Sequence, residues 1–368
     1  MSRSLGYARR KQFSSILVNL VLTIICLAWL TPTFGVFITS FRNSEDIFKT
    51  GWWTIFPHKE DVKVGEIKLP EDVDVNGVMT IEGAQATFEE LRQGVTLSDG
   101  RKLVWFGNKR SRKVEIFENR WVGFAANLTL ENYQNVLSGQ EIRFKGADGK
   151  EILRMGNNLG SAFLNSIAVA VPSTIIPILI AAFAAYAFAW MNFPGRKMFF
   201  IGVVALLVVP LQIALVPILQ DYTRLNLNGT YLAIWLAHTG FGLPLAIYLL
   251  FNYISQLPRE TLEAAFIDGA SHFTIFTRLI LPLSVPALAS FAIFQFLWVW
   301  NDYLVALVFL GDKTRVITSA LAAMVGEKGQ DWHLLTSGAF VSMLLPLTVF
   351  FALQRYFVRG LLAGSVKG

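Results

Sequence analysis

Four residues with side chains suited to ligand binding, Trp300, Asn301, Asp302 and Tyr303, stand together in the otherwise apolar run "LWVWNDYLVAL". Aromatic rings stack on the apolar faces of a pyranose, while amides and carboxylates bind its hydroxyl groups. An ionisable residue at membrane depth is a functional candidate by default. The four residues are therefore a candidate pathway for a sugar. The alternative is an aromatic belt at the membrane interface, with Asn301 and Asp302 facing a watery vestibule, and the sequence leaves both open.

A second polar stretch, "EAAFIDGASHFTIFTRLILP" from Glu263 to Pro282, separates two long apolar runs. Pro258 suits the first position of a helix, Gly269 suits a C-terminal stop, and Ser271 suits the cap of a second helix. The spacing predicts two short helices joined at a glycine corner. One face of the first helix would carry Leu262, Ala265, Phe266 and Gly269.

The predicted first helix has the composition of a helix that docks on a protein. Ala264 and Ala265 are small enough for close approach, which is typical of a helix laid in a partner's groove. A helix lying on the bilayer would instead be rich in Lys and Arg. Acids outnumber bases in this helix and its C-terminal turn, which contain Arg259, Glu260, Glu263 and Asp268. We therefore expect a protein partner.

Motifs for catalysis are missing from the sequence. It contains no G-x-x-x-x-G-K-[ST], no H-E-x-x-H and no G-x-S-x-G. The four histidines lie far apart, and Cys26 is the only cysteine, so no metal cluster or disulfide framework is indicated. We expect no catalytic residue, no bound metal and no enzyme activity in this chain.

The composition is that of a multi-span membrane protein. The 368 residues are 54% hydrophobic and 16% charged, whereas a soluble domain has about 25% charged residues. The net charge of +6 does not indicate a nucleic-acid partner. A spanning helix needs roughly 20 mostly apolar residues. Six stretches of the sequence qualify: 15–39, 162–190, 198–219, 230–254, 284–310 and 334–357. The predicted fold class is all-α and polytopic.

Lys and Arg in the short segments set the orientation of the spans. If the N-terminus is cytoplasmic, segments 1–14, 191–197, 255–283 and 358–368, with Arg355, hold eleven Lys and Arg against three acids. Both termini are then expected in the cytoplasm. The stretch that begins at Glu263 lies in the cytoplasm as well.

One outer segment, 40–160, is large and polar. Alternating strand-like runs occur at "KVGEIKL", "GVMTIEG", "KLVWF" and "KVEIFENRW". Asp99-Gly100 and Asp148-Gly149 suit turns, and "ATFEELRQG" predicts a short helix that ends at Gly94. We expect a small β-rich domain at about 57–127, between the first two spans.

The sequence resembles the inner-membrane permease subunits of ABC importers. E-A-A-x-x-x-G-A followed by an apolar-Leu-Pro is the motif of that family, and this chain has it from Glu263 to Ala270 and at Leu281-Pro282. The segments "LTLENYQNVL", "FPGR", "WNDYLVAL" and "LQRYFVRGLLAGSVKG" are similar to the carbohydrate-uptake, maltose-type members. The resemblance covers about 1–56 and 128–368. The insert 57–127 departs from the family and is similar to permeases of α-glucoside systems.

This resemblance implies a type I importer fold and a division of labour between chains. The loop 255–283 would be the coupling helix on a dimer of ABC ATPase subunits, which would hold ATP and Mg, while this chain binds no cofactor. The coupling residues would be Glu263, Ala264, Ala265, Phe266, Asp268, Gly269 and Ala270. Arg355, Gly360, Gly364 and Gly368 of the tail would also contact the ATPase.

Other partners follow from the same resemblance. A sister permease subunit would complete a heterodimeric pore in the bacterial inner membrane and work by alternating access. A solute-binding protein would deliver the sugar to the outer loop 311–333. In this scheme residues 1–39 hold the N-terminus and first span, 161–357 the permease core, and 358–368 a cytoplasmic tail.

Three alternatives remain on the sequence alone. An ion-coupled secondary transporter would share the membrane core, although it would more often show several buried carboxylates. An ABC importer permease for a non-sugar solute would share the motif. A membrane-anchored enzyme or sensor would have its active part in 57–127. The identity of the sugar is not given by the sequence.

Overall fold

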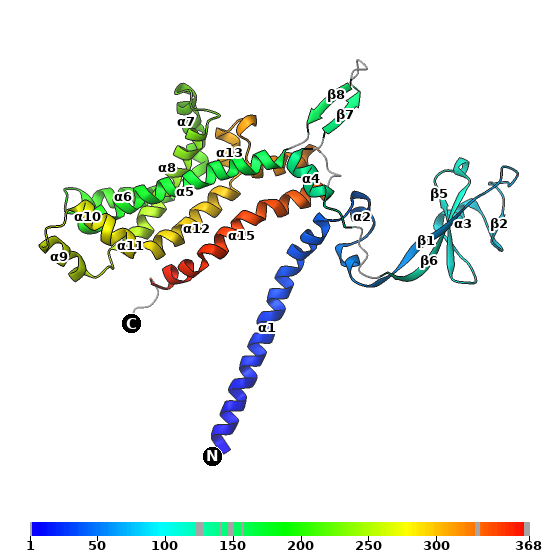
Figure 1. Cartoon of the computed structure of the whole chain (residues 1–368), viewed down its shortest axis with the longest axis horizontal. Helices are drawn as coiled ribbons and strands as arrows, with labels where there is room; N and C mark the ends of the chain where they lie inside the picture. Colours follow the sequence, from blue (N-terminus) through cyan, green and yellow to red (C-terminus); the bar gives the residue numbers. More distant parts are fainter. Residues whose placement is uncertain are drawn as a thin grey trace. The chain divides into compact units, whose positions relative to one another are not determined.

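The computed structural model describes residues 2–122, 128–139, 141–145, 151–155, 158–327 and 332–363. The chain forms two compact units, residues 1–129 and 130–368 (Figure 1). The first unit holds one long helix and a small sheet domain, and the second is a bundle of helices. Each unit is described by itself below.

The first unit begins with helix α1 (Ser2–Ser40), whose part Gln12–Ser40 is long and apolar enough to cross a membrane. Its side chains from Gln12 to Phe34 are exposed, and most are apolar. A helical segment that is apolar all round and exposed within its unit fits contact with lipid.

A four-stranded antiparallel sheet in the order β1-β6-β5-β4 is the centre of the insert. Its core is formed by Leu91, Leu103, Trp105 and Val114, all buried, and no described residue outside 67–116 belongs to this cluster. The elements of the first unit after α1 are α2 (Ser44–Lys49), η1 (Trp52–Ile55), β1 (His58–Lys68), β2 (Met79–Ile81), β3 (Ala84–Ala86), α3 (Phe88–Gln93), β4 (Val95–Thr96), β5 (Arg101–Phe106), η2 (Lys109–Ser111) and β6 (Lys113–Val122).

The short helix α3 confirms the predicted stop at Gly94, which has a φ of +98° and so favours glycine. Thr87 and Glu90 form a capping box at its start: Glu90 N donates to Thr87 Oγ1, and Thr87 N donates to the Glu90 carboxylate. Gly100 also has a positive φ, as expected for a turn. The predicted turn at Asp148-Gly149 lies outside the described residues.

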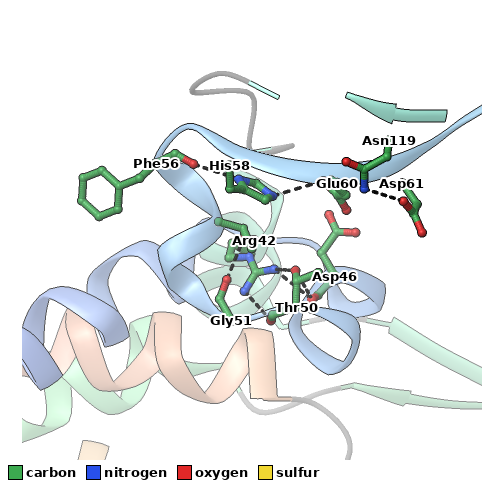
Figure 2. A network of polar contacts seen from close by, with 10 residues as sticks. Arg42, Asp46, Thr50, Gly51, Phe56, His58, Glu60, Asp61 and Asn119 are labelled. Carbon is green, nitrogen blue, oxygen red and sulfur yellow. Dashed lines mark hydrogen bonds and ion pairs between the residues drawn. The ribbon is translucent and has the colours of Figure 1, made fainter. Parts of the chain in front are cut away.

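The insert is joined to α1 by a short paired neck. The backbones of Arg42 and Leu128 form an isolated antiparallel β-bridge, and Thr129 N donates to Phe41 O at 2.6 Å. Figure 2 shows the buried Arg42 guanidinium pointing toward Asp46 and Thr50; its Nη atoms donate to Asp46 O at 2.9 Å and Thr50 O at 3.0 Å. These bonds fix the chain between α1 and the start of β1.

The second unit is built on α5, which packs against α8 and α12, while α12 also packs against α15. Figure 1 shows these four helices running side by side. Its elements are α4 (Glu131–Ser138), β7 (Glu141–Lys145), β8 (Glu151–Met155), α5 (Leu159–Trp190), α6 (Arg196–Ala205), η3 (Leu206–Val208), α7 (Leu211–Arg224), α8 (Tyr231–Ile254), α9 (Arg259–Ile267), α10 (His272–Ile275), the π-helical turn η4 (Phe276–Ile280), α11 (Leu281–Leu283), α12 (Val285–Asn301), α13 (Leu304–Phe309), η5 (Asp312–Thr314), α14 (Ile317–Glu327) and α15 (Trp332–Ala363).

The bundle has two buried clusters, one at each end of α5. Leu159 and Ala162 belong to the first, and Ala185 and Tyr186 to the second. Between them Gln295 of α12 donates to Ser173 O of α5 at 3.1 Å and to His238 O of α8 at 3.4 Å. A side chain on Gly242 would collide with Gln295, so this glycine allows the close approach of α8 and α12.

Among the described residues, four helices are long and apolar enough to span a membrane: Gln12–Ser40, Leu159–Trp190, Tyr231–Ile254 and Trp332–Tyr356. Two bent pairs raise the number to as many as six if each counts as one span. The prediction of a continuous helix over 198–219 is wrong. Residues Arg196–Val208 and Leu211–Arg224 meet at 102° around Pro210. Proline has no N–H to donate and disfavours helical geometry in the residue before it, here the extended Val209.

The predicted helix over 284–310 is also broken. The pair His272–Leu283 and Val285–Asn301 bends by 72°, and α12 ends at Asn301. Asp302 is extended, and a separate helix α13 begins at Leu304. The predicted tail starts inside a helix, because α15 continues to Ala363.

Candidate functional site

The stretch around Glu263 forms two helices that meet at a glycine corner, as the sequence predicts. At the end of α9, Ala270 N donates to Ala265 O and Gly269 N donates to Phe266 O, both at 3.0 Å. These are the two bonds of a Schellman motif, and Gly269 has the required φ of +78°. Ser271 Oγ then accepts from Thr274 N and caps α10. We call α9, the corner and α10 the prong.

The first helix begins one residue later than predicted, so Pro258 is the N-cap of α9 and not its first helical residue. The first helix is therefore Arg259–Ile267, and the acid of its first turn is Glu260. Glu263 is exposed and its Oε1 lies 2.7 Å from Arg259 Nε, one turn earlier. Pairs of this kind on an exposed helix face are weak, so Glu263 can exchange Arg259 for another base at little cost.

The apolar residues of α9 lie on two different faces of the helix. Leu262 is fully buried, and Ala265 packs against the same cluster as Ile275 and Ile280. This face holds the prong on its own bundle, which the sequence analysis did not foresee. The face turned away from the bundle carries exposed Glu263, Ala264 and Asp268, together with Ile267, which is 85% exposed.

Tyr186 of α5 fixes the prong to the bundle. Its hydroxyl lies 2.8 Å from His272 Nδ1, and the His272 ring also packs edge-on against Phe266 at 5.1 Å. Tyr186 is buried, and its ring also contacts Phe276. The sequence analysis missed this residue; the only signal was a lone hydroxyl in the alanine-rich run "AAFAAYAFAW".

The four predicted pathway residues lie in different surroundings. Trp300 is 3% exposed, stacks on Phe296 and donates from Nε1 to Ser342 O at 3.0 Å. Asn301 Nδ2 donates to Leu297 O within its own helix. Both side chains therefore have structural partners.

Asp302 holds the corner between α12 and α13. Its carboxylate accepts from Ala306 N at 3.0 Å and from Val305 N at 3.3 Å, which caps α13. Its backbone oxygen accepts from Thr318 Oγ1 of α14 at 2.6 Å. His238 Nε2 of α8 lies 3.8 Å from its carboxylate, which is too far for a hydrogen bond.

Tyr303 is 43% exposed and, unlike the other three, lines a cavity of about 440 Å³. Asp312, Arg315 and Ser319 supply the polar part of the lining, and the sequence analysis assigned none of them to a substrate. The remaining lining is small or aliphatic: Ala306, Leu307, Leu310, Gly311, Ala322 and Ala323.

In the last helix, Arg355 Nη2 donates to Tyr356 Oη at 2.8 Å, with its guanidinium over the Tyr356 ring. Gly360 lies in α15. Gly364 and Gly368 lie outside the described residues. Among the described residues, no three His, Cys, Asp or Glu side chains come together as a metal site.

Comparison with known proteins gives the family. Residues 177–362 match the binding-protein-dependent transport system inner membrane component family. The chain belongs to this permease family. The permease is thus a membrane transport subunit and not an enzyme, and the match favours a binding-protein-dependent importer over an ion-coupled secondary transporter.

Two relatives match almost the whole permease. The osmoprotective compounds uptake permease of Synechocystis sp. is 46% identical over 352 residues, covering 95% of this chain and 91% of the relative. The alpha-glucoside transport system permease of Rhizobium meliloti is 46% identical over 384 residues, covering 95% and 97%. The permease also resembles a chain of a bacterial ABC transporter that imports alginate, with a TM-score of 0.58, 15% identity, and coverage of 95% and 98%. That likeness concerns the fold.

Proposed function

We propose that the permease is one half of a heterodimeric pore of an ATP-driven sugar importer, and that the prong couples it to a separate ATPase dimer. The observation that carries the coupling role is the division of the prong into two faces. Leu262 and Ala265 bind it to the bundle, whereas Ala264 and Ile267 remain exposed on a short, stiff helix. An exposed helix face that carries apolar Ala264 and Ile267 beside acidic Glu263 and Asp268 fits a groove on a partner protein.

Motion of the prong would reach the bundle through three contacts. Leu262 is packed in the cluster that contains Ile254 and Phe276, and the Tyr186 hydroxyl contacts His272. The π-helical turn η4 leads directly into the bent pair α11–α12. Turns of this type are frequent at functional sites. A force on α9 would therefore act on α5, α8 and α12 together.

A sugar is supported as the solute by the relatives and by the cavity beside Tyr303. One relative is named for alpha-glucosides, and another permease that matches, from Thermococcus litoralis, is named for trehalose and maltose. We place the permease in the bacterial inner membrane with both termini and the prong in the cytoplasm. The insert and the loop 311–333 then face outward, where a solute-binding protein would dock, and the tail from Arg355 would contact the ATPase.

The coupling role predicts that Ile267→Asp releases the ATPase. Ile267 is 85% exposed, so the change costs little in folding, but it would bury a carboxylate in an apolar groove. We expect co-purification of the ATPase with the permease to fall about tenfold or more. Thr261→Asp, at another exposed position of α9, is the charge-matched control and should retain the ATPase. Wild-type recovery of the ATPase with Ile267→Asp would refute docking through this face.

The insert can be deleted between two residues that are paired across β1 and β6, which keeps the pairing of the strand ends that remain. Lys59 and Trp121 are paired across β1 and β6, so residues 60–120 can be replaced by Asn-Gly, a favoured two-residue hairpin turn. The whole core cluster of the insert leaves with them, while the Arg42 neck stays. We expect the shortened permease to assemble and to keep on the order of half of its uptake, since insertions of this kind are peripheral. Complete loss of uptake in an assembled transporter would instead make the insert central to function.

A further inference from the structure

The cavity beside Tyr303 has a lining that suits one class of ligand. Asp312 and Arg315 form an ion pair at its rim, with Asp312 Oδ1 2.7 Å from Arg315 Nη2. Tyr303 supplies an exposed ring and Ser319 a hydroxyl. The volume of about 440 Å³ lies within the usual range for small-molecule sites.

Hydrogen bonds from other elements hold this lining in place. Asn165 of α5 donates from Nδ2 to Arg315 O at 3.0 Å, and Tyr231 of α8 donates its hydroxyl to Asn165 Oδ1 at 2.8 Å. Thr314 Oγ1 donates to Gly229 O at 3.3 Å. On the other wall the Asp302 cap fixes the start of α13, next to Tyr303. The backbone that carries the polar groups is therefore fixed before any ligand arrives, which lowers the entropy cost of binding.

The charges at the rim favour a neutral solute. Asp312 and Arg315 carry opposite charges, with Oδ1 and Nη2 2.7 Å apart, so together they give the rim no net charge to attract an ion, although the exposed pair itself is weak. A neutral ligand with neighbouring hydroxyls can instead donate to the carboxylate and accept from the guanidinium at the same time. A ring with an apolar face can also pack on Tyr303.

We propose that this cavity is a subsite of the permease for a neutral glycoside, bound through Tyr303, Asp312, Arg315 and Ser319. This inference rests on the proposed sugar import and adds a direct contact between the sugar and this subunit. Its position at the α12–α13 corner places the sugar next to the Asp302 junction, which joins α8, α13 and α14.

Saturation-transfer NMR on the solubilised importer without its binding protein tests the subsite. The probes are maltose, trehalose, sucrose and glucuronate. We expect signals from a neutral sugar with the wild type, reduced about three- to tenfold by Tyr303→Ala. Tyr248→Ala is the matched control, because Tyr248 is 39% exposed on α8 and lines neither the cavity nor the prong. Asp312→Asn removes one negative charge from the rim, which makes the rim more positive and should shift the preference toward glucuronate.

Uptake of the same sugars by the wild type in liposomes, with binding protein and ATP, separates the two proposals. If the wild type imports a neutral sugar but Tyr303→Ala binds it as well as Tyr248→Ala does, the subsite is wrong and the importer function stands. If the wild type imports none of the sugars tested and gives no NMR signal, both are overturned. Loss of signal with Tyr303→Ala, together with the shift for Asp312→Asn, supports the subsite.

Discussion

Gly269→Pro is expected to abolish uptake while the permease still inserts and assembles. Proline fixes φ near −65°, whereas Gly269 has a φ of +78° at the corner of the prong. Proline also removes the N–H that donates to Phe266 O. The substitution would destabilise the corner by about 3 kcal/mol. If the intact corner is needed for coupling, we expect uptake to fall on the order of 100-fold.

Gly269→Asn is the matched control for this prediction. Asparagine tolerates the left-handed region better than other non-glycine residues, and a Cβ at this position would meet no atom within 4 Å. We expect uptake with Gly269→Asn to stay within about fivefold of the wild type. Uptake and ATPase activity of both variants should be measured in liposomes, with the amount of inserted permease determined for each. Normal uptake with Gly269→Pro would show that the corner does not transmit the motion.

The prong could be predicted from sequence because its signals are local. Gly269 and Ser271 act on bonds to residues a few positions away, so their types alone indicate the corner and the second cap. The direction of each face was not predictable in the same way. Leu262 and Ile267 are both apolar, and only the position of α5 and α8 decides that the first is buried and the second exposed.

The breaks in the apolar runs show a second limit of prediction from the sequence. Hydropathy over a window does not distinguish one helix from two, so 198–219 and 284–310 each read as a single span. Pro210 was a visible signal for the first break, but prolines also occur inside α5, α8 and α15 without ending them. Pro210 ends the helix because Val209 before it is extended and the chain turns there.

Asp302 illustrates a residue whose importance was predicted but whose role was not. Its charge in an apolar run marked it as functional. Its partners, Thr318 and His238, are distant in sequence and could not be read from it. The cavity residues Asp312, Arg315 and Ser319 were assigned only to the outer loop 311–333, since the fold alone brings them to Tyr303.

Asp302→Ala is expected to lower uptake about tenfold, because it leaves the N–H groups of Val305 and Ala306 without their acceptor at a partly buried corner. The α13–α14 segment would lose its fixed start, and with it the placement of Tyr303. Uptake in liposomes and the melting temperature of the purified transporter should fall together.

Asp302→Asn separates the cap from the charge. Asparagine also accepts from backbone N–H groups at a helix start, but it removes the negative charge near His238. The cap bonds are 3.0 and 3.3 Å long, whereas His238 Nε2 lies 3.8 Å from the carboxylate, so the cap should carry most of the effect. We expect Asp302→Asn to restore at least about half of the wild-type uptake. If Asp302→Asn is as defective as Asp302→Ala, the charge beside His238 is what the corner requires, and the junction between α8 and α13 is electrostatic.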